Sequence, residues 1–326
     1  MFGMVKSLTP YIKVYMVKKL KQIKLRYQPI QVTIEPTNVC NFTCSFCNQN
    51  DPDHFSKRQA GRIDIQDYEI ILDKIKNSCL NLKALSLTLD GEPTLHKDFP
   101  EMIKKANEKG FFVRFSSNGT RIDRAFLEKT RNLSYLISVD FSIDKDGFEK
   151  YRGNNGSWSL VNKNLKMMVD YLNVNKNLCL EIFENSAHYD GLEKARANLK
   201  RMKERFGKIS GLIYDLRRYH KLLNEQPHDS RHNGYYGCYY PWTSLNVAWN
   251  GDVVTCCRDL DGKYNLGNIL QSSIEEVWNG QKYLHLRDSI LKQRLQSIPS
   301  CRSCDLPYDS QRNRWDYTIQ KIFRKW

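Results

Sequence analysis

The sequence lacks the features of a membrane-spanning or secreted protein. It contains no run of about 18 or more apolar residues, so no membrane-spanning helix is expected. The stretch 1–27 also lacks a continuous apolar segment and a small-residue cleavage site, which argues against a secretory signal. These absences predict a cytoplasmic protein.

Acidic residues are scarce. The chain of 326 residues has 36 Asp and Glu against 51 Lys and Arg, which gives a net charge of +15. Such an excess favours acidic partners, including nucleotides, phosphorylated sugars, acidic peptides and anionic lipid, or it serves solubility alone. With 40% hydrophobic and 27% charged residues, the composition is that of a folded globular protein.

Cysteine, by contrast, is abundant, with ten residues. In a reducing compartment these residues are more typical of metal ligands than of disulfides. Cys40, Cys44 and Cys47 are spaced C-x3-C-x2-C. Three thiolates hold a [4Fe–4S] cluster with one iron left open, and an open coordination position permits chemistry at the metal. A zinc site completed by a distant ligand such as His54 is the alternative.

Strand and helix patterns alternate from residue 31 onwards, which predicts parallel βα units. We expect an α/β fold: a partial (β/α)6 TIM-like barrel over 31–222, whose functional residues lie at the carboxyl ends of the strands. The predicted strands are 31–35, 83–89, 111–116, 135–142, 178–183 and 211–216, and the predicted helices are 67–78, 98–109, 123–130, 159–172 and 190–206.

The pattern changes after about residue 220, and we expect a small α+β domain over 223–310. Asn250-Gly251 between two apolar alternations, 244–249 and 252–257, predicts a hairpin. A helix is expected over 272–292. A basic helical extension over 1–30 and a basic aromatic tail over 311–326 are expected to flank the two domains.

The cysteine trio directly after the first strand, with Phe46 before the last cysteine, resembles the signature of the radical S-adenosylmethionine (SAM) superfamily. The resemblance implies that SAM binds the open iron through its methionine group. Its reductive cleavage then gives a 5′-deoxyadenosyl radical, which abstracts a hydrogen atom from the substrate.

Three further stretches resemble the same superfamily, each at the end of a predicted strand. The stretch 90-DGEPTL-95 is similar to its Gly-Gly-Glu-Pro segment, with Asp90 in place of the first glycine. The stretch 116-SSNGT-120 resembles its Ser-Asn-Gly turn, and 141-FSIDKDGFEKYRG-153 its Ser-x-Asp and Arg-Gly stretch. The cofactor-binding residues that the resemblance implies are Gly91, Glu92, Pro93, Ser117, Asn118, Ser142, Asp144 and Arg152.

A second cysteine set follows in the predicted small domain: Cys238, Cys256, Cys301 and Cys304. Four thiolates saturate a cluster, which then relays electrons or braces the fold, although a structural zinc site fits the same number of ligands. The surrounding sequence resembles the SPASM auxiliary-cluster domain or its shortened twitch form. No cysteine follows Cys304, which favours the short form. The resemblance implies one auxiliary [4Fe–4S] cluster, two clusters in all, with Cys256 preferred over Cys257 as the ligand.

Catalytic candidates lie on the fifth predicted strand and directly after the sixth. Alternation places Cys179, Glu181 and Phe183 on one face of the strand, pointing into the barrel. Glu181 is a candidate base or hydroxyl anchor, and a salt-bridged surface Glu181 is the alternative. Cys179 is a candidate hydrogen-atom donor, or else a small buried hydrophobe. Arg217 is a candidate anchor for an acidic group, or part of a solvated basic loop.

These features favour a radical SAM enzyme that oxidises a small polar substrate, such as a sugar, an aminocyclitol or a nucleotide-like molecule, with the auxiliary cluster as electron acceptor. A reducing partner such as flavodoxin or ferredoxin is expected, and a nucleic acid partner is not. One alternative is a peptide-modifying maturase or epimerase of the same superfamily, acting on an acidic peptide. A zinc-stapled polyanion-binding protein is an alternative of another class.

Overall fold

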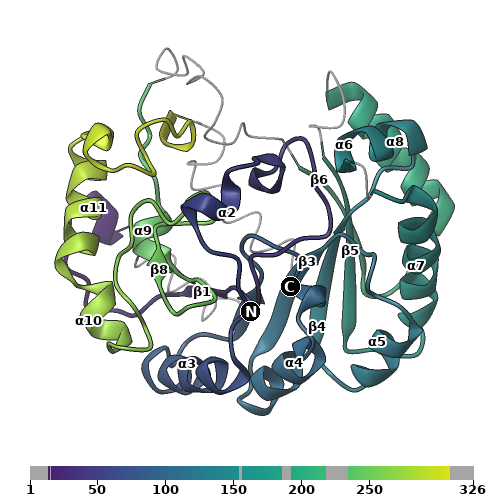
Figure 1. Cartoon of the computed structure of the whole chain (residues 1–326), viewed down its shortest axis with the longest axis horizontal. Helices are drawn as coiled ribbons and strands as arrows, with labels where there is room; N and C mark the ends of the chain where they lie inside the picture. Colours follow the sequence, from purple (N-terminus) through teal and green to yellow (C-terminus); the bar gives the residue numbers. More distant parts are fainter. Residues whose placement is uncertain (1–13, 15, 154–155, 186–191, 218–233, 309–326) are drawn as a thin grey trace.

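Six parallel strands form the centre of the computed structural model, which describes residues 14, 16–153, 156–185, 192–217 and 234–308 (Figure 1). The strands lie in sequence order across one sheet. This order confirms the predicted partial (β/α)6 barrel. The strands are β1 Gln31–Ile34, β2 Ala84–Leu87, β3 Phe112–Ser117, β4 Tyr135–Asp140, β5 Leu178–Asn185 and β6 Leu212–Arg217.

The helices between these strands cover the outer face of the sheet (Figure 1). Several begin at a side-chain cap: Asp64 accepts a hydrogen bond from Gln66 N, and Asp123 accepts one from Phe126 N. The helices correspond to the five predicted ones: α3 Ile65–Ser78, α4 Phe99–Glu108, α5 Arg124–Lys129, α7 Trp158–Tyr171 and α8 Leu192–Phe206. Two further short helices, α2 His54–Lys57 and α6 Lys145–Arg152, lie within the motif-bearing loops.

The two faces of the central strands differ in chemistry. The helix-facing residues are aliphatic or aromatic and fully buried, including Leu85, Val113, Ile137 and Leu180. On the opposite face, strand register places Ser116 of β3, Ser138 of β4 and Glu181 of β5 side by side. The interior face of the barrel therefore carries a row of polar side chains at this level.

The sheet continues beyond β1 into the second part of the chain. Strand β7 (Ser244–Val247) pairs in parallel with β1, and β8 (Val253–Val254) pairs antiparallel with β7, so the predicted hairpin is confirmed. Its turn contains Gly251, whose φ of +83° suits glycine. Since backbone hydrogen bonds tie the two regions together, the loop after β1 lies where they meet.

The single helix predicted over 272–292 is wrong, because the segment forms α10 (Ile274–Trp278) and α11 (Gln281–Leu291). Asn279 ends α10, and its amide exchanges two hydrogen bonds with the backbone of Leu25, at 2.8 and 3.0 Å. The N-terminal segment therefore contacts the chain at the point between α10 and α11 where the helix is interrupted. The other short elements are α9 Tyr240–Thr243 and 3-10 turns at Asn48–Asn50, Pro93–Leu95, Leu295–Ser297 and Leu306–Tyr308.

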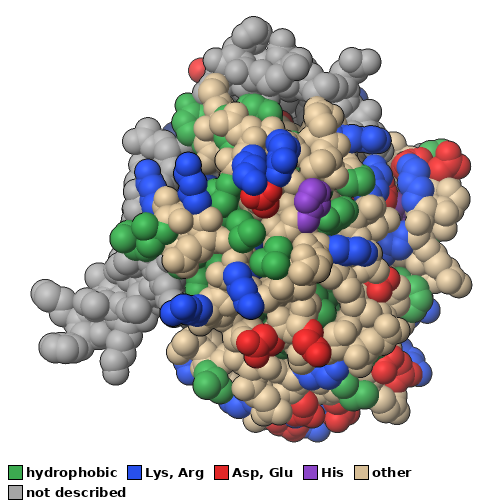
Figure 2. All heavy atoms as spheres, turned by 90° about the vertical axis from the view of Figure 1, so that its left-hand side faces the viewer, with side chains coloured by type: hydrophobic (Ala, Val, Ile, Leu, Met, Phe, Trp, Pro, Cys, Tyr) green, Lys and Arg blue, Asp and Glu red, His purple; other side chains and the backbone are tan. Residues whose placement is uncertain are grey.

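Within the described ranges, no helix has both the length and the apolar character that crossing a membrane requires. The whole of the predicted tail over 311–326 lies outside these ranges, as do residues 218–233 of the predicted linker region. On the face shown in Figure 2, Lys and Arg side chains are scattered rather than gathered in one patch. The domain limits drawn from the sequence stay a prediction.

Candidate functional site

The cysteine trio occupies a tight loop that begins shortly after β1. The backbone N–H of Phe42 donates to Cys40 Sγ at 3.4 Å, and Cys47 N donates to Cys44 O at 2.9 Å. A third contact comes from α6, where the Arg152 guanidinium donates to Cys44 Sγ at 3.5 Å. The loop is thus held by its own backbone and by one buried cation.

The electrostatics of the loop suit a bound cluster whose iron core carries positive charge. Burial, with smaller contributions from Glu92, Cys44 and Cys47, raises the pKa of Cys40 to about 12, although a backbone hydrogen bond from Phe42 opposes the shift. Burial likewise raises the pKa of Cys47 to about 12. Thiolates at such a site need nearby positive charge, which bound iron supplies as it deprotonates its ligands. The donor set therefore fits an iron–sulfur cluster with one iron free of protein thiolate.

The zinc alternative required a distant ligand for the cysteine trio, and His54 was the candidate. His54, the proposed distant zinc ligand, instead lies 2.7 Å from Asp90 and 3.7 Å from Asp261.

Glu92, after β2, connects two of the predicted cofactor-binding stretches. Its carboxylate is 2% exposed and accepts hydrogen bonds from Ser117 Oγ at 2.9 Å and Asn118 N at 2.6 Å. Thr94 contributes two more donors, its N–H at 3.1 Å and its hydroxyl at 2.6 Å. Burial raises the pKa of Glu92, and these four donors oppose that shift. The carboxylate thus fixes the ends of β2 and β3 relative to each other.

Gly91 brings the same stretch against the cysteine loop. A Cβ atom here would lie 2.3 Å from the carbonyl oxygen of Val39, so a side chain does not fit without movement of backbone. Glu92 N donates to that same oxygen at 2.9 Å. Val39 directly precedes Cys40, so the 90–93 stretch is built against the thiols. Pro93 opens the short 3-10 turn that follows.

The third stretch forms α6 and its start. Asp144 caps α6, and Ser142 Oγ accepts from Asp144 N at 3.1 Å. Arg152, at the end of α6, donates to the Asp140 carbonyl at 2.5 Å and lies 3.1 Å from its carboxylate. Arg152 therefore links the cysteine loop to β4, a role the sequence did not reveal. Its cofactor contact stays a prediction, as do those of Ser142 and Asp144.

The second cysteine set lies in the region of β8 and the C-terminal turns. Burial raises the pKa values of Cys238, Cys256, Cys301 and Cys304, and for Cys238 the value is about 12. Each of these four thiols also interacts electrostatically with other members of the set or with a cation beside it. Cys257 is exposed, which agrees with the choice of Cys256. The donor set again fits a cluster.

Two of the predicted catalytic residues, Cys179 and Glu181, lie within β5 rather than at its carboxyl end. Glu181 is in the middle of β5, fully buried, and accepts a hydrogen bond from Ser138 Oγ at 2.5 Å. Cys179 is half-buried, and burial raises its thiol pKa while Arg114 opposes the shift. For Arg217 only the backbone, at the end of β6, is described. The roles of all three stay predictions.

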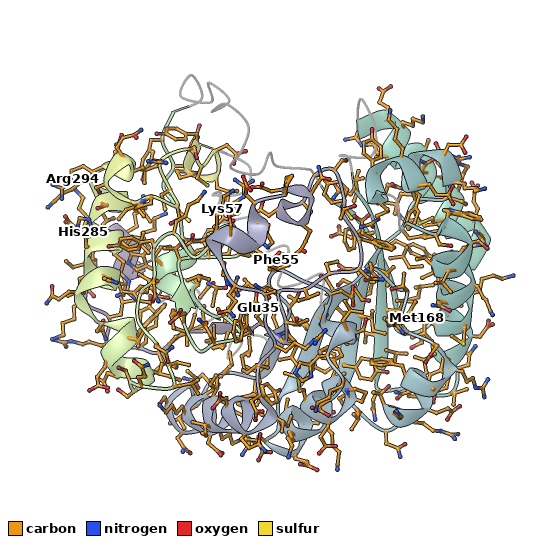
Figure 3. The ribbon with its side chains drawn as sticks, viewed as in Figure 1. Glu35, Phe55, Lys57, Met168, His285 and Arg294 are labelled. Atoms are coloured by element: carbon orange, nitrogen blue, oxygen red, sulfur yellow. The ribbon has the colours of Figure 1, made fainter. Side chains whose placement is uncertain are left out.

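A buried charged network between the two regions was missed by sequence reasoning. The network comprises Asp90, His54, Asp261, Glu35 and Arg58. The carboxylates of Asp90 and Asp261 flank His54 of α2. The Arg58 guanidinium contacts Glu35 and also donates to the Leu260 carbonyl at 2.9 Å. Figure 3 shows Glu35 at the centre of the molecule, below α2 with Phe55 and Lys57. The sequence feature that could have revealed this network is Asp90, because it replaces the first glycine of the family segment and its carboxylate contacts His54.

This network predicts a pH dependence of stability. Asp261 and Asp90 raise the pKa of His54 from 6.5 to about 9, against the opposing effect of burial. A raised histidine pKa stabilises the fold fully below about pH 6.5, and the stabilisation is lost as pH rises through about 9. Between these values the wild type should lose on the order of 1 to 3 kcal/mol more unfolding free energy than His54→Gln. Denaturant unfolding at both pH values measures this, and equal losses would contradict the network.

A model of the radical SAM superfamily matches residues 34–188, and a model of the SPASM iron-sulfur cluster-binding domain matches residues 238–305. The tungsten-containing aldehyde ferredoxin oxidoreductase cofactor-modifying protein of Pyrococcus furiosus is 24% identical over 321 residues, covering 84% of this chain and 86% of that protein.

Two further likenesses span most of the chain. The S-adenosyl-L-methionine-dependent 2-deoxy-scyllo-inosamine dehydrogenase of Niallia circulans is 21% identical, covering 88% of this chain and 97% of the dehydrogenase. The solved structure of native anSMEcpe with bound AdoMet and Cp18Cys peptide superposes with a TM-score of 0.57 at 15% identity, covering 90% of this chain and 98% of that one. At this identity the structural likeness shows the fold.

Proposed function

Since the chain belongs to the radical SAM superfamily and carries a C-terminal SPASM domain, we propose that it oxidises a small polar substrate. The substrate class is a sugar, an aminocyclitol or a nucleotide-like molecule. When bound at the first cysteine set, the cluster and SAM supply a radical that removes a hydrogen atom from the substrate. An external reductant of the flavodoxin or ferredoxin type starts each turnover.

One observation carries the oxidation in particular: a second, half-buried set of four cysteines is joined to the barrel through the pairing of β7 with β1. A four-thiolate cluster has no open iron, so its use is electron transfer or bracing rather than substrate binding. Oxidation needs such an acceptor, because the substrate loses a second electron after the hydrogen atom. The likeness to a SAM-dependent dehydrogenase over nearly its whole length supports this choice.

The side chains of the barrel position the cysteine loop and accept the substrate proton. Glu92, Ser117 and Asn118 fix the two strand ends that border the cysteine loop. Arg152 holds the loop against β4 through Asp140. The polar row inside the barrel supplies Glu181, which we assign as the base that receives the substrate proton.

The Glu181→Gln variant tests the assignment of the base. A glutamine keeps the shape and accepts the hydrogen bond from Ser138, but it does not take a proton. Deoxyadenosine should still form, while oxidised product falls by about 100-fold or more, in line with the usual contribution of a general base. Anaerobic assays with both products quantified decide this, and unchanged oxidation would remove Glu181 from the mechanism.

Peptide modification is the second candidate function. It is favoured by the fold likeness to anSMEcpe, whose solved structure holds a peptide with AdoMet. Incubation of anaerobically reconstituted protein with SAM, reductant and panels of aminocyclitols, sugars or peptides separates the two. Deoxyadenosine above background together with a new carbonyl in a small molecule supports the proposal, whereas a modified peptide would replace it.

A further inference from the structure

The second cysteine set has a buried arginine of its own. Arg258 is 6% exposed, and it follows Cys256 by two residues. Its backbone N–H donates to Cys256 Sγ at 3.4 Å, and its guanidinium donates to Cys304 Sγ at 3.5 Å. One residue thus provides hydrogen-bond donors to two of the four proposed ligands.

The position of the guanidinium is fixed by a carboxylate. Asp305 forms an ion pair with Arg258, and Asp305 directly follows Cys304 in the sequence. A second cation, Lys18 of the N-terminal extension, interacts electrostatically with Cys238. On the acidic side, Asp305 pairs with Arg258, and the carboxylate of Asp259 accepts hydrogen bonds from the N–H and the hydroxyl of Thr255. The surroundings are therefore of mixed charge, with the arginine in direct contact with sulfur.

The first cysteine set also has a buried arginine, but the charged groups around it differ. Arg152 contacts Cys44 Sγ at 3.5 Å, but it also donates to the Asp140 carbonyl. Two carboxylates lie beside this loop, because Glu92 N donates to the Val39 carbonyl at 2.9 Å and the Asp90 carboxylate accepts from Gln49 Nε2 at 2.9 Å. The two sites are thus electrostatically distinct, and positive charge with N–H donors to sulfur favours the reduced form of a cluster.

We propose that Arg258 sets the reduction potential of the auxiliary cluster, keeping it positive enough to accept an electron from the substrate. This inference rests on the proposed oxidation. After loss of a hydrogen atom, the substrate radical gives one electron to the oxidised auxiliary cluster and one proton to the base, leaving a new carbonyl. The added negative charge on the cluster is stabilised by the two N–H donors and the positive charge of Arg258.

The test uses the full-length chain with Cys40, Cys44 and Cys47 replaced by alanine, so that only the auxiliary cluster gives a signal. EPR-monitored redox titration compares this background with the same background carrying Arg258→Gln, Arg258→Lys or Arg302→Gln. Arg302 is the matched control, because it lies between Cys301 and Cys304 in sequence but is exposed. The potential should fall in Arg258→Gln, fall less in Arg258→Lys, and stay unchanged in Arg302→Gln.

A second readout separates tuning from a structural role. In the chain with all cluster cysteines present, Arg258→Lys should form deoxyadenosine at the wild-type rate but less oxidised product per deoxyadenosine. An unchanged potential in both Arg258 variants, or an equal shift in Arg302→Gln, would overturn the inference and leave the proposed oxidation intact. If the background holds no cluster at all, the ligand assignment fails and the proposed function fails with it. Should Arg258→Gln not retain the cluster, Arg258→Lys alone decides.

Discussion

Replacing Cys44 with alanine should abolish cleavage of SAM, whereas replacing Cys304 with alanine should leave some cleavage and block net oxidation. Cys44 is buried in the loop after β1, contacts Arg152, and is one of only three thiols proposed to hold the first cluster. Loss of one leaves too few thiolates to keep a cubane with a single open iron. Cys304 belongs to the second set, and its loss affects the electron acceptor instead.

Cys79→Ala is the matched control for this pair. Cys79 is also buried, but it ends α3 and belongs to neither set, so both activities should persist. Deoxyadenosine and oxidised product are quantified together by chromatography after anaerobic reconstitution. Equal loss of both products in the Cys44 and Cys304 variants would mean that the second set braces the fold and transfers no electron.

Replacing Glu92 with alanine should destabilise the chain by about 3 kcal/mol or more, since buried donors left without an acceptor each cost about 1 to 3 kcal/mol. The affected donors belong to Thr94, Ser117 and Asn118, which lie after β2 and at the end of β3. SAM binding should weaken in parallel, because the 90–93 stretch packs against the residue before Cys40.

Chemical unfolding followed by circular dichroism measures the first effect, and equilibrium dialysis with labelled SAM measures the second. Glu101→Ala serves as the control, because Glu101 lies on the surface of α4 with its side chain 44% exposed. That change should cost less than about 0.5 kcal/mol. A Glu92 variant as stable as the Glu101 variant would show that the carboxylate does not brace the strand ends.

Local signals in the sequence were sufficient to predict the barrel. Each predicted helix carries caps or breakers that the structure uses, such as Asp64 before α3 and Gly110 after α4, where φ is +83°. The strands carry an apolar face that packs on the helices, so their order could be predicted from alternation alone. The Asn250-Gly251 turn was equally visible, because it requires glycine at a positive φ.

Contacts between distant segments could not be predicted. Nothing in Ser244–Val247 specifies that it pairs with β1, about two hundred residues earlier, rather than forming a separate sheet. The break between α10 and α11 depends on Asn279 meeting Leu25. The contacts of Arg152 with Cys44 and of Arg258 with Cys304 likewise became visible only in three dimensions, because the sequence does not show which residue an arginine contacts.

The central claim is that the first cysteine set leaves one iron of a cubane for SAM. Its most direct test is Mössbauer spectroscopy of anaerobically reconstituted protein whose second cysteine set is replaced by alanine, recorded with and without SAM. We expect a cubane spectrum in which the signal of a single iron changes when SAM is added. Absence of a cubane, or a cubane whose iron signals all stay the same, would contradict it.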